Sequence, residues 1–223
     1  MKTGVIFAWD GVVLNSADYH KRSWEALAEE HGFVLPSGYL RKTFGRDNCA
    51  VIMSVLNWTS NPRRAEELAE RKEALMRQIF AEETPEPLPG IRTLLNALKE
   101  REIPCAVACP VFREEVDFVL EILGLTGAFS AVIAHGNVQT SVGSSEAFQL
   151  AAKAVDRAPR DCIAVLSTIS GVEAARAAGM TTVAVATVNP RELLERAGAD
   201  AVLDSMRELD ASTISALSIL RRS

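Results

Sequence analysis

The second half of the chain alternates between helical patterns and short apolar stretches, and this alternation limits the fold more than any other feature. Each of five stretches rich in Ala, Val, Ile and Leu follows a segment with helical spacing. They are IPCAVAC, SAVIAH, DCIAVL, TTVAVA and AVL, within residues 103–203. Apolar strands joined by helices form parallel sheets that are covered on both faces. We therefore predict an α/β protein with a Rossmann-like, doubly wound parallel sheet.

The N-terminal stretch VIFAWDG, residues 5–11, predicts a first buried strand that ends in a turn at Asp10. Ligands of open α/β sheets bind at the carboxyl ends of the strands, which makes Asp10 a candidate site residue. Asp10 can act as an acid/base group, or it can be a structural turn residue that holds backbone N–H groups. The residue two positions earlier is Ala8, which has no functional group.

A helical segment separates this strand from the rest of the sheet. One helix starts where Asn15 or Ser16 can cap it and ends at Gly32, and Trp24 lies on its apolar face. The stretch TPEPLPG, with three prolines and a glycine, closes the segment. Further helices are expected at residues 37–44, 47–57 and 62–83.

The order of these patterns predicts two domains. Residues 1–14 and 87–223 form the α/β core, and residues 15–86 form an all-helical cap inserted after the first strand. An insert at the carboxyl end of a strand is expected to cover the ligand crevice.

Composition narrows the function classes. The formal net charge is −5, with 48% hydrophobic and 24% charged residues and no basic block, which argues against nucleic acid or a membrane surface as partner. No apolar run is long enough for a membrane span, and the first residues lack the pattern of a signal peptide. The cysteines lack CxxC spacing, so we expect reduced thiols in a cytoplasmic protein and no metal cluster. They are Cys49, Cys105, Cys109 and Cys162.

Four segments together resemble the haloacid dehalogenase superfamily, in its beta-phosphoglucomutase-like branch with a helical cap. They are VIFAWDGVVLNSADYHKRSWEALAEEHG, TFGRDN, PLPGIRTLLNALKE and GVEAARAAGM. The resemblance covers essentially the whole chain. It implies a Rossmann-like core and, in ordinary members, Mg²⁺-dependent phosphoryl transfer through an aspartyl-phosphate.

The resemblance also identifies positions at which this chain departs from the family. The first motif, Asp-x-Asp in the family, is Ala8-Trp9-Asp10 here, so the nucleophile is missing and the acid/base Asp10 remains. Without the metal-binding acids we expect no Mg²⁺ site and no other cofactor. The other degenerate positions are Cys109 for the phosphate-binding Ser/Thr, Val142 for the Lys, and Leu166 and Ser167 for the acidic pair.

In the cap, the resemblance implies substrate-binding roles for His20, Arg46, Asn48 and Lys72. His20 matches a hinge histidine, but it can equally be a helix-surface residue. Arg46 follows Gly45 at a helix start, where an anion binds favourably, or it is a solvated arginine. Lys72 lies in the charge-rich stretch AEELAERKEALMRQ, for which a solvated helix face is the favoured interpretation.

These patterns leave three functions open. The first is a catalytically inactive protein that binds a small phosphorylated metabolite or a protein partner. The second is a hydrolase or phosphomutase with a rearranged site, in which Asp10, Cys109 or a water molecule acts on a phosphorylated metabolite. The third is an interaction module that uses the outer surface of the cap.

Overall fold

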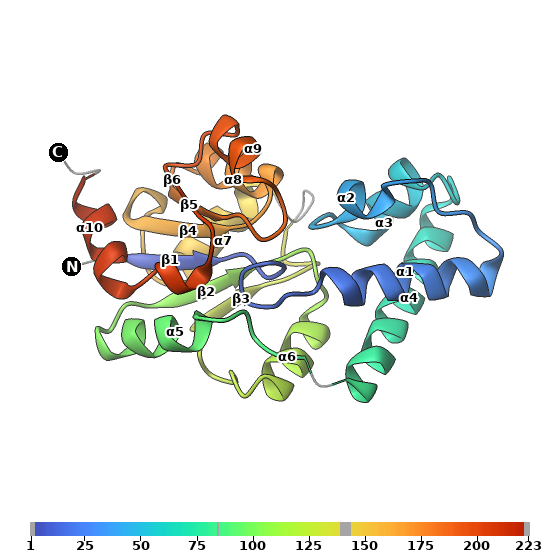
Figure 1. The fold of residues 1–223 in the computed structure, drawn as a ribbon, viewed down its shortest axis with the longest axis horizontal. Coiled ribbons are helices and arrows are strands. Elements are labelled where there is room, and N and C mark those ends of the chain that lie inside the picture. The colour runs from blue at the N-terminus through green and yellow to red at the C-terminus, as the bar shows by residue number, and fades with distance from the viewer. Residues whose placement is uncertain (1–2, 84, 139–143, 221–223) are drawn as a thin grey trace. The chain divides into compact units, whose positions relative to one another are not determined.

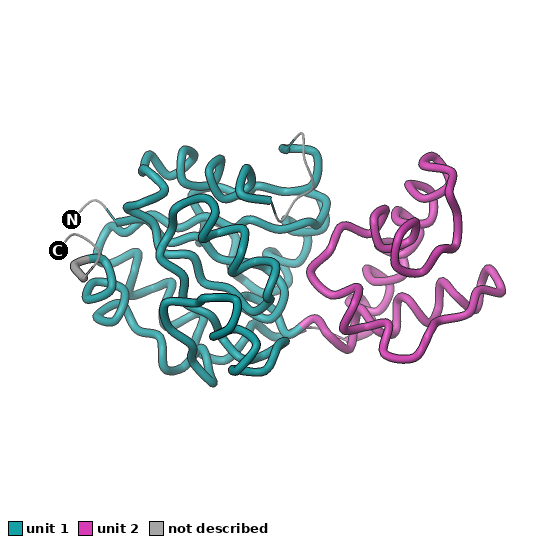
Figure 2. Tube along the Cα trace, turned by 90° about the horizontal axis from the view of Figure 1, so that it is seen from above, with its two compact units in different colours: residues 1–15, 86–223 teal, residues 16–85 magenta. Residues whose placement is uncertain are grey.

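A computed structural model describes residues 3–83, 85–138 and 144–220, and the chain divides into two compact units (Figure 1, Figure 2). The core unit comprises residues 1–15 and 86–223, and the cap unit comprises residues 16–85.

The core unit is built on a six-stranded sheet whose paired strands are all parallel. The strands are β1 Gly4–Phe7, β2 Cys105–Ala108, β3 Ala131–Ile133, β4 Cys162–Leu166, β5 Thr181–Val185 and β6 Ala201–Leu203. Their order is β3-β2-β1-β4-β5-β6. Each predicted apolar stretch forms a strand, and the predicted doubly wound α/β fold is confirmed.

The strand order reverses between β1 and β4, at the centre of the sheet. Val5 is in register with Cys105 of β2 on one side and with Ile163 of β4 on the other. In doubly wound sheets this reversal opens the crevice in which ligands bind, at the carboxyl ends of the strands. The residues that follow β1 and β4 therefore define where a site is expected.

Helices cover the sheet on both sides; Figure 1 shows α5 below it and α8 and α9 above it. On one face, Ile6, Ala164 and Leu166 pack against Phe148 and Ala151 of α7 in a buried cluster. The last helix is not predicted from the sequence, because its stretch ASTISALSIL lacks a charged face. The core-unit helices are α5 Ile91–Glu100, α6 Arg113–Ile122, α7 Ser145–Ala154, η2 Pro159–Asp161, α8 Ile169–Ala177, α9 Arg191–Arg196, η3 Met206–Glu208 and α10 Ala211–Leu220.

The elements of the cap unit that the structure describes are helices. The core of this unit contains Trp24, which is 2% exposed and packs against Trp58 with ring centroids 5.8 Å apart. The predicted helix over residues 47–57 is wrong in detail, because only three residues are α-helical before a π-helical turn follows. The cap elements are α1 Ala17–His31, α2 Tyr39–Thr43, α3 Asn48–Ala50, η1 Val51–Val55 and α4 Pro62–Glu82.

Local signals explain where the two long cap helices begin and end. Asn61 accepts hydrogen bonds from the N–H groups of Arg63 and Arg64 and so caps α4, whose first residue is Pro62. Gly32 ends α1 with φ +66°, a conformation that costs glycine little. Ser16 occupies the N-cap position of α1, but its side chain makes no capping hydrogen bond.

The chain leaves the core unit and returns to it at neighbouring points. Leu14 and Pro87 form an antiparallel bridge, and the N–H of Leu88 donates to the carbonyl of Val13 at 2.8 Å.

Among the described residues, no helix combines the length and the apolar character that crossing a membrane requires.

Candidate functional site

The turn after β1 lies at the reversal point of the strand order. The carbonyl of Trp9 accepts hydrogen bonds from the N–H groups of Val13 at 2.9 Å and Leu14 at 3.2 Å. The chain therefore folds back directly after the strand. Asp10 stands in this turn and is only 7% exposed. The predicted site residue thus lies at the edge of the sheet where open α/β folds bind ligands.

Gly11 is required by the shape of this turn. Its φ is +71°, and a Cβ atom added to it would lie 2.4 Å from Val188 Cγ2 and 2.9 Å from Ser167 Oγ. Both a left-handed backbone and the absence of a side chain are therefore needed here. The turn leaves no space for even one additional methyl group.

Two hydroxyl groups hold the carbonyls of the turn. Ser167 Oγ donates to the carbonyl of Asp10 at 2.7 Å, and Thr187 Oγ1 donates to the carbonyl of Gly11 at 2.5 Å. Ser167 directly follows β4 and is 1% exposed, and Thr187 lies just beyond β5. The ends of two further strands therefore fix the turn with hydrogen bonds from the protein itself.

The other predicted positions that the structure describes lie on the same edge of the sheet. Ala8 extends β1, since its N–H donates to the carbonyl of Val165 at 2.9 Å. Cys109 directly follows β2 and is 1% exposed, and Leu166 ends β4 with no exposed surface. Val142 lies outside the described residues. Where the resemblance implies a nucleophile, a phosphate-binding hydroxyl and an acid, the structure has a methyl, a thiol and an isobutyl group.

The donor groups at this edge can be compared with what Mg²⁺ requires. Mg²⁺ takes six oxygen ligands and in proteins uses one or two carboxylates with phosphate oxygens. Among the described residues, no group of three or more His, Cys, Asp and Glu side chains is arranged to hold a metal ion. The carbonyl of Asp10 accepts the Ser167 hydroxyl. Leu166 and Ser167 thus supply no carboxylate at this edge.

Two polar residues that the sequence analysis missed also follow β2 and β3. Glu115 lies in the first turn of α6 and is 7% exposed. The ring of His135 contacts that of Phe112 with centroids 4.5 Å apart. The backbone N–H of His135 donates to the carbonyl of Val111 at 2.8 Å. A carboxylate at a helix N-terminus and a histidine after a strand are the signals by which both can be found.

In the cap unit, the structure brings together three of the four predicted substrate-binding residues. His20 Nδ1 lies 2.8 Å from Lys72 Nζ, which also lies 3.0 Å from Glu73 Oε1. Asn48 Nδ2 donates to the same Glu73 oxygen at 2.6 Å. We call His20, Asn48, Lys72 and Glu73 the cap cluster. It joins α1, α3 and α4, and Glu73 is its unpredicted member.

The solvated helix face favoured for Lys72 is wrong. Its side chain has no exposed surface, and its Nζ lies 5.7 Å from the centroid of the Trp24 ring. Along α4, Leu68, Met76 and Phe80 are buried at helical spacing around Lys72. The spacing of these apolar residues in the sequence places Lys72 on the buried face of the helix. The many charges of the helix lie on its other face.

Charge compensation explains how the cap cluster tolerates burial. Burial acts to raise the pKa of Glu73, but Lys72, His20 and the hydrogen bonds from Lys72 and Asn48 outweigh it and hold the pKa below its ordinary value.

The predicted residue Arg46 does not join this cluster, because it lies after α2 as an exposed side chain.

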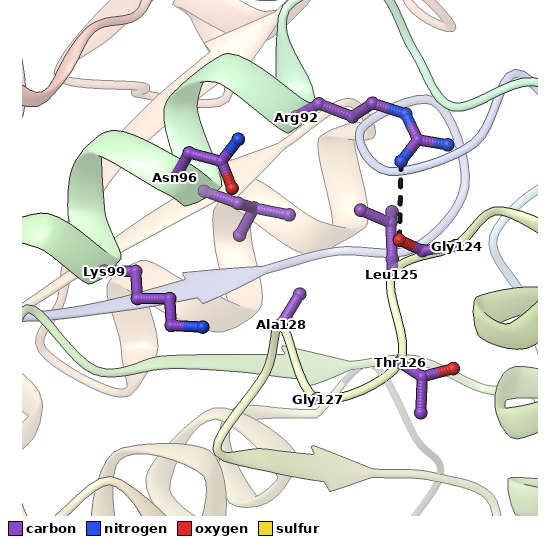
Figure 3. Close-up of a pocket in the computed structure, with 9 residues that line it drawn as sticks. Arg92, Asn96, Lys99, Gly124, Leu125, Thr126, Gly127 and Ala128 are labelled. Carbon is purple, nitrogen blue, oxygen red and sulfur yellow. Dashed lines mark hydrogen bonds between the residues drawn. The ribbon is translucent and has the colours of Figure 1, made fainter.

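A separate polar hollow of about 190 Å³ lies elsewhere on the core unit, between α5 and the loop from α6 to β3 (Figure 3). Arg92 spans it and donates to the carbonyls of Leu123 and Gly124, which closes the C-terminus of α6. Asn96 and Lys99, on the same helix α5, also line it, and the loop with Gly127 lies opposite them. Because the loop precedes β3, the hollow does not belong to the edge that carries Asp10.

Two known proteins are similar to this chain over most of its length. The 5-amino-6-(5-phospho-D-ribitylamino)uracil phosphatase, chloroplastic, of Arabidopsis thaliana is 30% identical over 208 residues, which are 92% of this chain and 55% of that protein. The chain thus spans just over half the length of this relative. The beta-phosphoglucomutase of Bacillus subtilis (strain 168) is 27% identical over 213 residues, which cover 92% of this chain and 93% of the enzyme.

Solved structures agree with the fold. The crystal structure of beta-phosphoglucomutase from Clostridium difficile matches with a TM-score of 0.85 at 24% identity, over 99% of this chain and 98% of that one. The family model of haloacid dehalogenase-like hydrolases matches residues 2–179. From the sheet order and these matches we conclude that the chain belongs to the haloacid dehalogenase-like hydrolases, in the beta-phosphoglucomutase-like branch.

Proposed function

We propose that this chain is a non-catalytic member of its family, which binds a small phosphorylated metabolite and does not transfer the phosphoryl group. The observation that carries the proposal is the 2.7 Å hydrogen bond from Ser167 Oγ to the carbonyl of Asp10. At the position where the resemblance implies a metal-binding acid, the chain has a hydroxyl that is used internally. The proteins named above are one phosphatase and two beta-phosphoglucomutases, and the proposal is that this chain lacks the chemical step for which they are named.

Chemical reasoning supports this separation. Transfer through an aspartyl-phosphate needs a carboxylate nucleophile, a cation on the phosphoryl oxygens and acids that hold Mg²⁺. Ala8 supplies no nucleophile, and Leu166 and Ser167 supply no acid. Loss of a covalent nucleophile alone lowers a rate by ~10⁴–10⁶. Asp10 then keeps the turn in place, and neither Mg²⁺ nor another cofactor is part of the proposal.

The ligand class rests on the relatives. Two of them are named for phosphorylated small molecules, a phosphoribitylamino-uracil and a phosphoglucose. In this proposal His20, Arg46 and Asn48 remain the predicted contacts of the cap to the ligand. The protein works in a reducing compartment such as the cytoplasm, which fits four cysteines that form no disulfide.

An activity assay tests the missing chemical step. The chain is incubated with p-nitrophenyl phosphate and with β-glucose 1-phosphate in the presence of Mg²⁺, and phosphate release is measured. We expect release at the rate of a blank without protein. Turnover well above this blank that is abolished by Asp10→Asn would overturn the proposal.

A thermal-shift screen of phosphorylated sugars with and without Mg²⁺ tests binding. A saturable increase in melting temperature that does not depend on Mg²⁺ is the expected result. If none of the sugar phosphates shifts the melting temperature, the metabolite part of the proposal is wrong, and capture of a protein partner becomes the next experiment.

A hydrolase or phosphomutase with a rearranged site is the second candidate, and the buried Glu115 is the observation that favours it. A carboxylate that is 7% exposed at the ligand-binding edge is a candidate acid/base group. Turnover that persists in a metal chelator and is lost in Glu115→Gln, with Glu114→Gln as the matched exposed control, would support this alternative over the first.

A further inference from the structure

The ammonium group of Lys72 has three hydrogen-bond partners within the cap unit. Its Nζ lies 2.8 Å from His20 Nδ1, 3.0 Å from Glu73 Oε1 and 3.3 Å from Met76 Sδ. An ammonium carries three hydrogens and cannot accept a hydrogen bond. All three hydrogens are therefore used, and the side chain has no exposed surface. A ligand can gain a hydrogen bond from Lys72 only if one of these partners is displaced.

The donor count also fixes the roles within the cap cluster. Because Lys72 can only donate, His20 Nδ1 is the acceptor in their contact. The ammonium of Lys72 and the carboxylate of Glu73 then balance each other. Glu73 Oε1 additionally accepts from Asn48 Nδ2 at 2.6 Å, so one oxygen holds both α3 and Lys72.

We propose that Glu73 determines ligand specificity by withdrawing Lys72 from ligand binding. The resemblance implies that Lys72 meets the non-reacting part of the substrate, but in this chain Glu73 neutralises the lysine and holds it in the cap. The inference rests on the proposed function for its ligand. It means that a second anionic group of the ligand gains no cation from the cap cluster, which leaves Arg46 as the predicted cationic contact of the cap.

The first test measures whether Lys72 is accessible. The folded protein is treated briefly with acetic anhydride, and acetylation of each lysine is quantified by mass spectrometry. Lys72 is expected to react at least tenfold more slowly than the exposed Lys42 and Lys153. In Glu73→Gln its reactivity should rise toward theirs, whereas Glu70→Gln, at an exposed position of the same helix, should leave it unchanged. Equal labelling of Lys72 and Lys42 in the unmodified protein overturns the inference.

The second test measures binding with a variant that leaves neither Lys72 nor Glu73 with an unpaired charge. Removal of one charge leaves the other buried without a partner, so Lys72→Met and Glu73→Gln alone are each expected to lower the melting temperature by about 6–20 °C. The double variant Lys72→Met/Glu73→Gln removes both charges at similar volume and is expected to stay folded, which circular dichroism checks. The two single variants and the double variant form a double-mutant cycle, which measures the coupling free energy between Lys72 and Glu73.

The probes are inorganic phosphate, glucose 1-phosphate and fructose 1,6-bisphosphate, titrated by calorimetry. For any probe that binds, the double variant should retain the dissociation constant within twofold, and the ratio of the bisphosphate constant to the monophosphate constant should not change. A tenfold or greater loss of affinity in the folded double variant overturns the inference. If no probe binds, the labelling experiment decides it alone. Phosphate release in the activity assay would contradict the proposed function and leave both of these outcomes unaffected.

Discussion

Replacement of Gly11 by alanine tests whether the turn after β1 is packed as tightly as described. The new methyl group would lie 2.4 Å from Val188 Cγ2 and 2.9 Å from Ser167 Oγ, at a φ of +71°. A left-handed backbone at a non-glycine residue costs about 1–2 kcal/mol. Overpacking of a filled site adds about 1–3 kcal/mol. Alanine also restricts the unfolded chain, which offsets a small part of this cost. We therefore expect the free energy of unfolding to fall by about 2–4 kcal/mol.

Gly127 offers a matched control in the same core unit. Its φ is +74°, and a Cβ atom there would meet no atom within 4 Å. Gly127→Ala therefore carries the backbone cost without the packing cost, and we expect a loss of about 1 kcal/mol. The difference between the two variants isolates the packing around the turn.

The assay is urea unfolding followed by circular dichroism, with the free energy taken from the midpoint at a common slope. The free energy of unfolding of Gly11→Ala should be about 1–3 kcal/mol lower than that of Gly127→Ala. Equal losses of unfolding free energy in the two variants would refute the reasoning. The turn at Gly11 would then have room for an additional group, contrary to the packing described.

Three further predictions concern the site and its surroundings. Ala8→Asp alone should not restore phosphate release from p-nitrophenyl phosphate with Mg²⁺, because the acids and the lysine are still absent; strong activity would mean that the other motif positions are misassigned. Burial raises the pKa of Cys105 to about 12 and that of Cys162 to about 11, so at pH 8 Ellman's reagent should modify both only after unfolding, and rapid modification of the folded protein would contradict their burial. The pKa of Glu73 is lowered by folding, so its stabilisation is complete above the ordinary value of 4.5 and is lost as the pH falls through the lowered value. Urea midpoints between pH 7 and pH 3 should therefore fall more steeply in the unmodified protein than in Glu73→Gln, and parallel curves would count against this coupling.

The sheet was predictable because its signal is local. Buried parallel strands are continuous apolar runs, and each such run after residue 87 forms a strand. The position of Ser167 at the end of β4 followed from the same pattern. Its hydrogen bond to Asp10 did not, since the two residues are 157 positions apart and no periodicity links them.

Three of the four members of the cap cluster were predicted, but their arrangement and Glu73 were not. The resemblance named His20, Asn48 and Lys72, yet the charges of α4 concealed which lysine is buried. Its partner His20 is 52 positions away, and the neighbouring Glu73 is one of many acids in the helix. Only three-dimensional contacts distinguish a buried carboxylate from a solvated one. Similarly, the sequence over 47–57 gives no sign of the π-helical turn in η1.

The central position of β1 has a consequence for how the protein is made. Of the six strands of the sheet, the ribosome produces this one before the others, but its two partners begin only at Cys105 and Cys162. Residues 16–85, a complete unit, emerge in between and can fold while Val5, Ile6 and Phe7 are still unpaired. An apolar segment that stays exposed during synthesis is a target for chaperones and for aggregation. Of the six strands, the one that carries the candidate site is therefore synthesised first and stays longest without a partner.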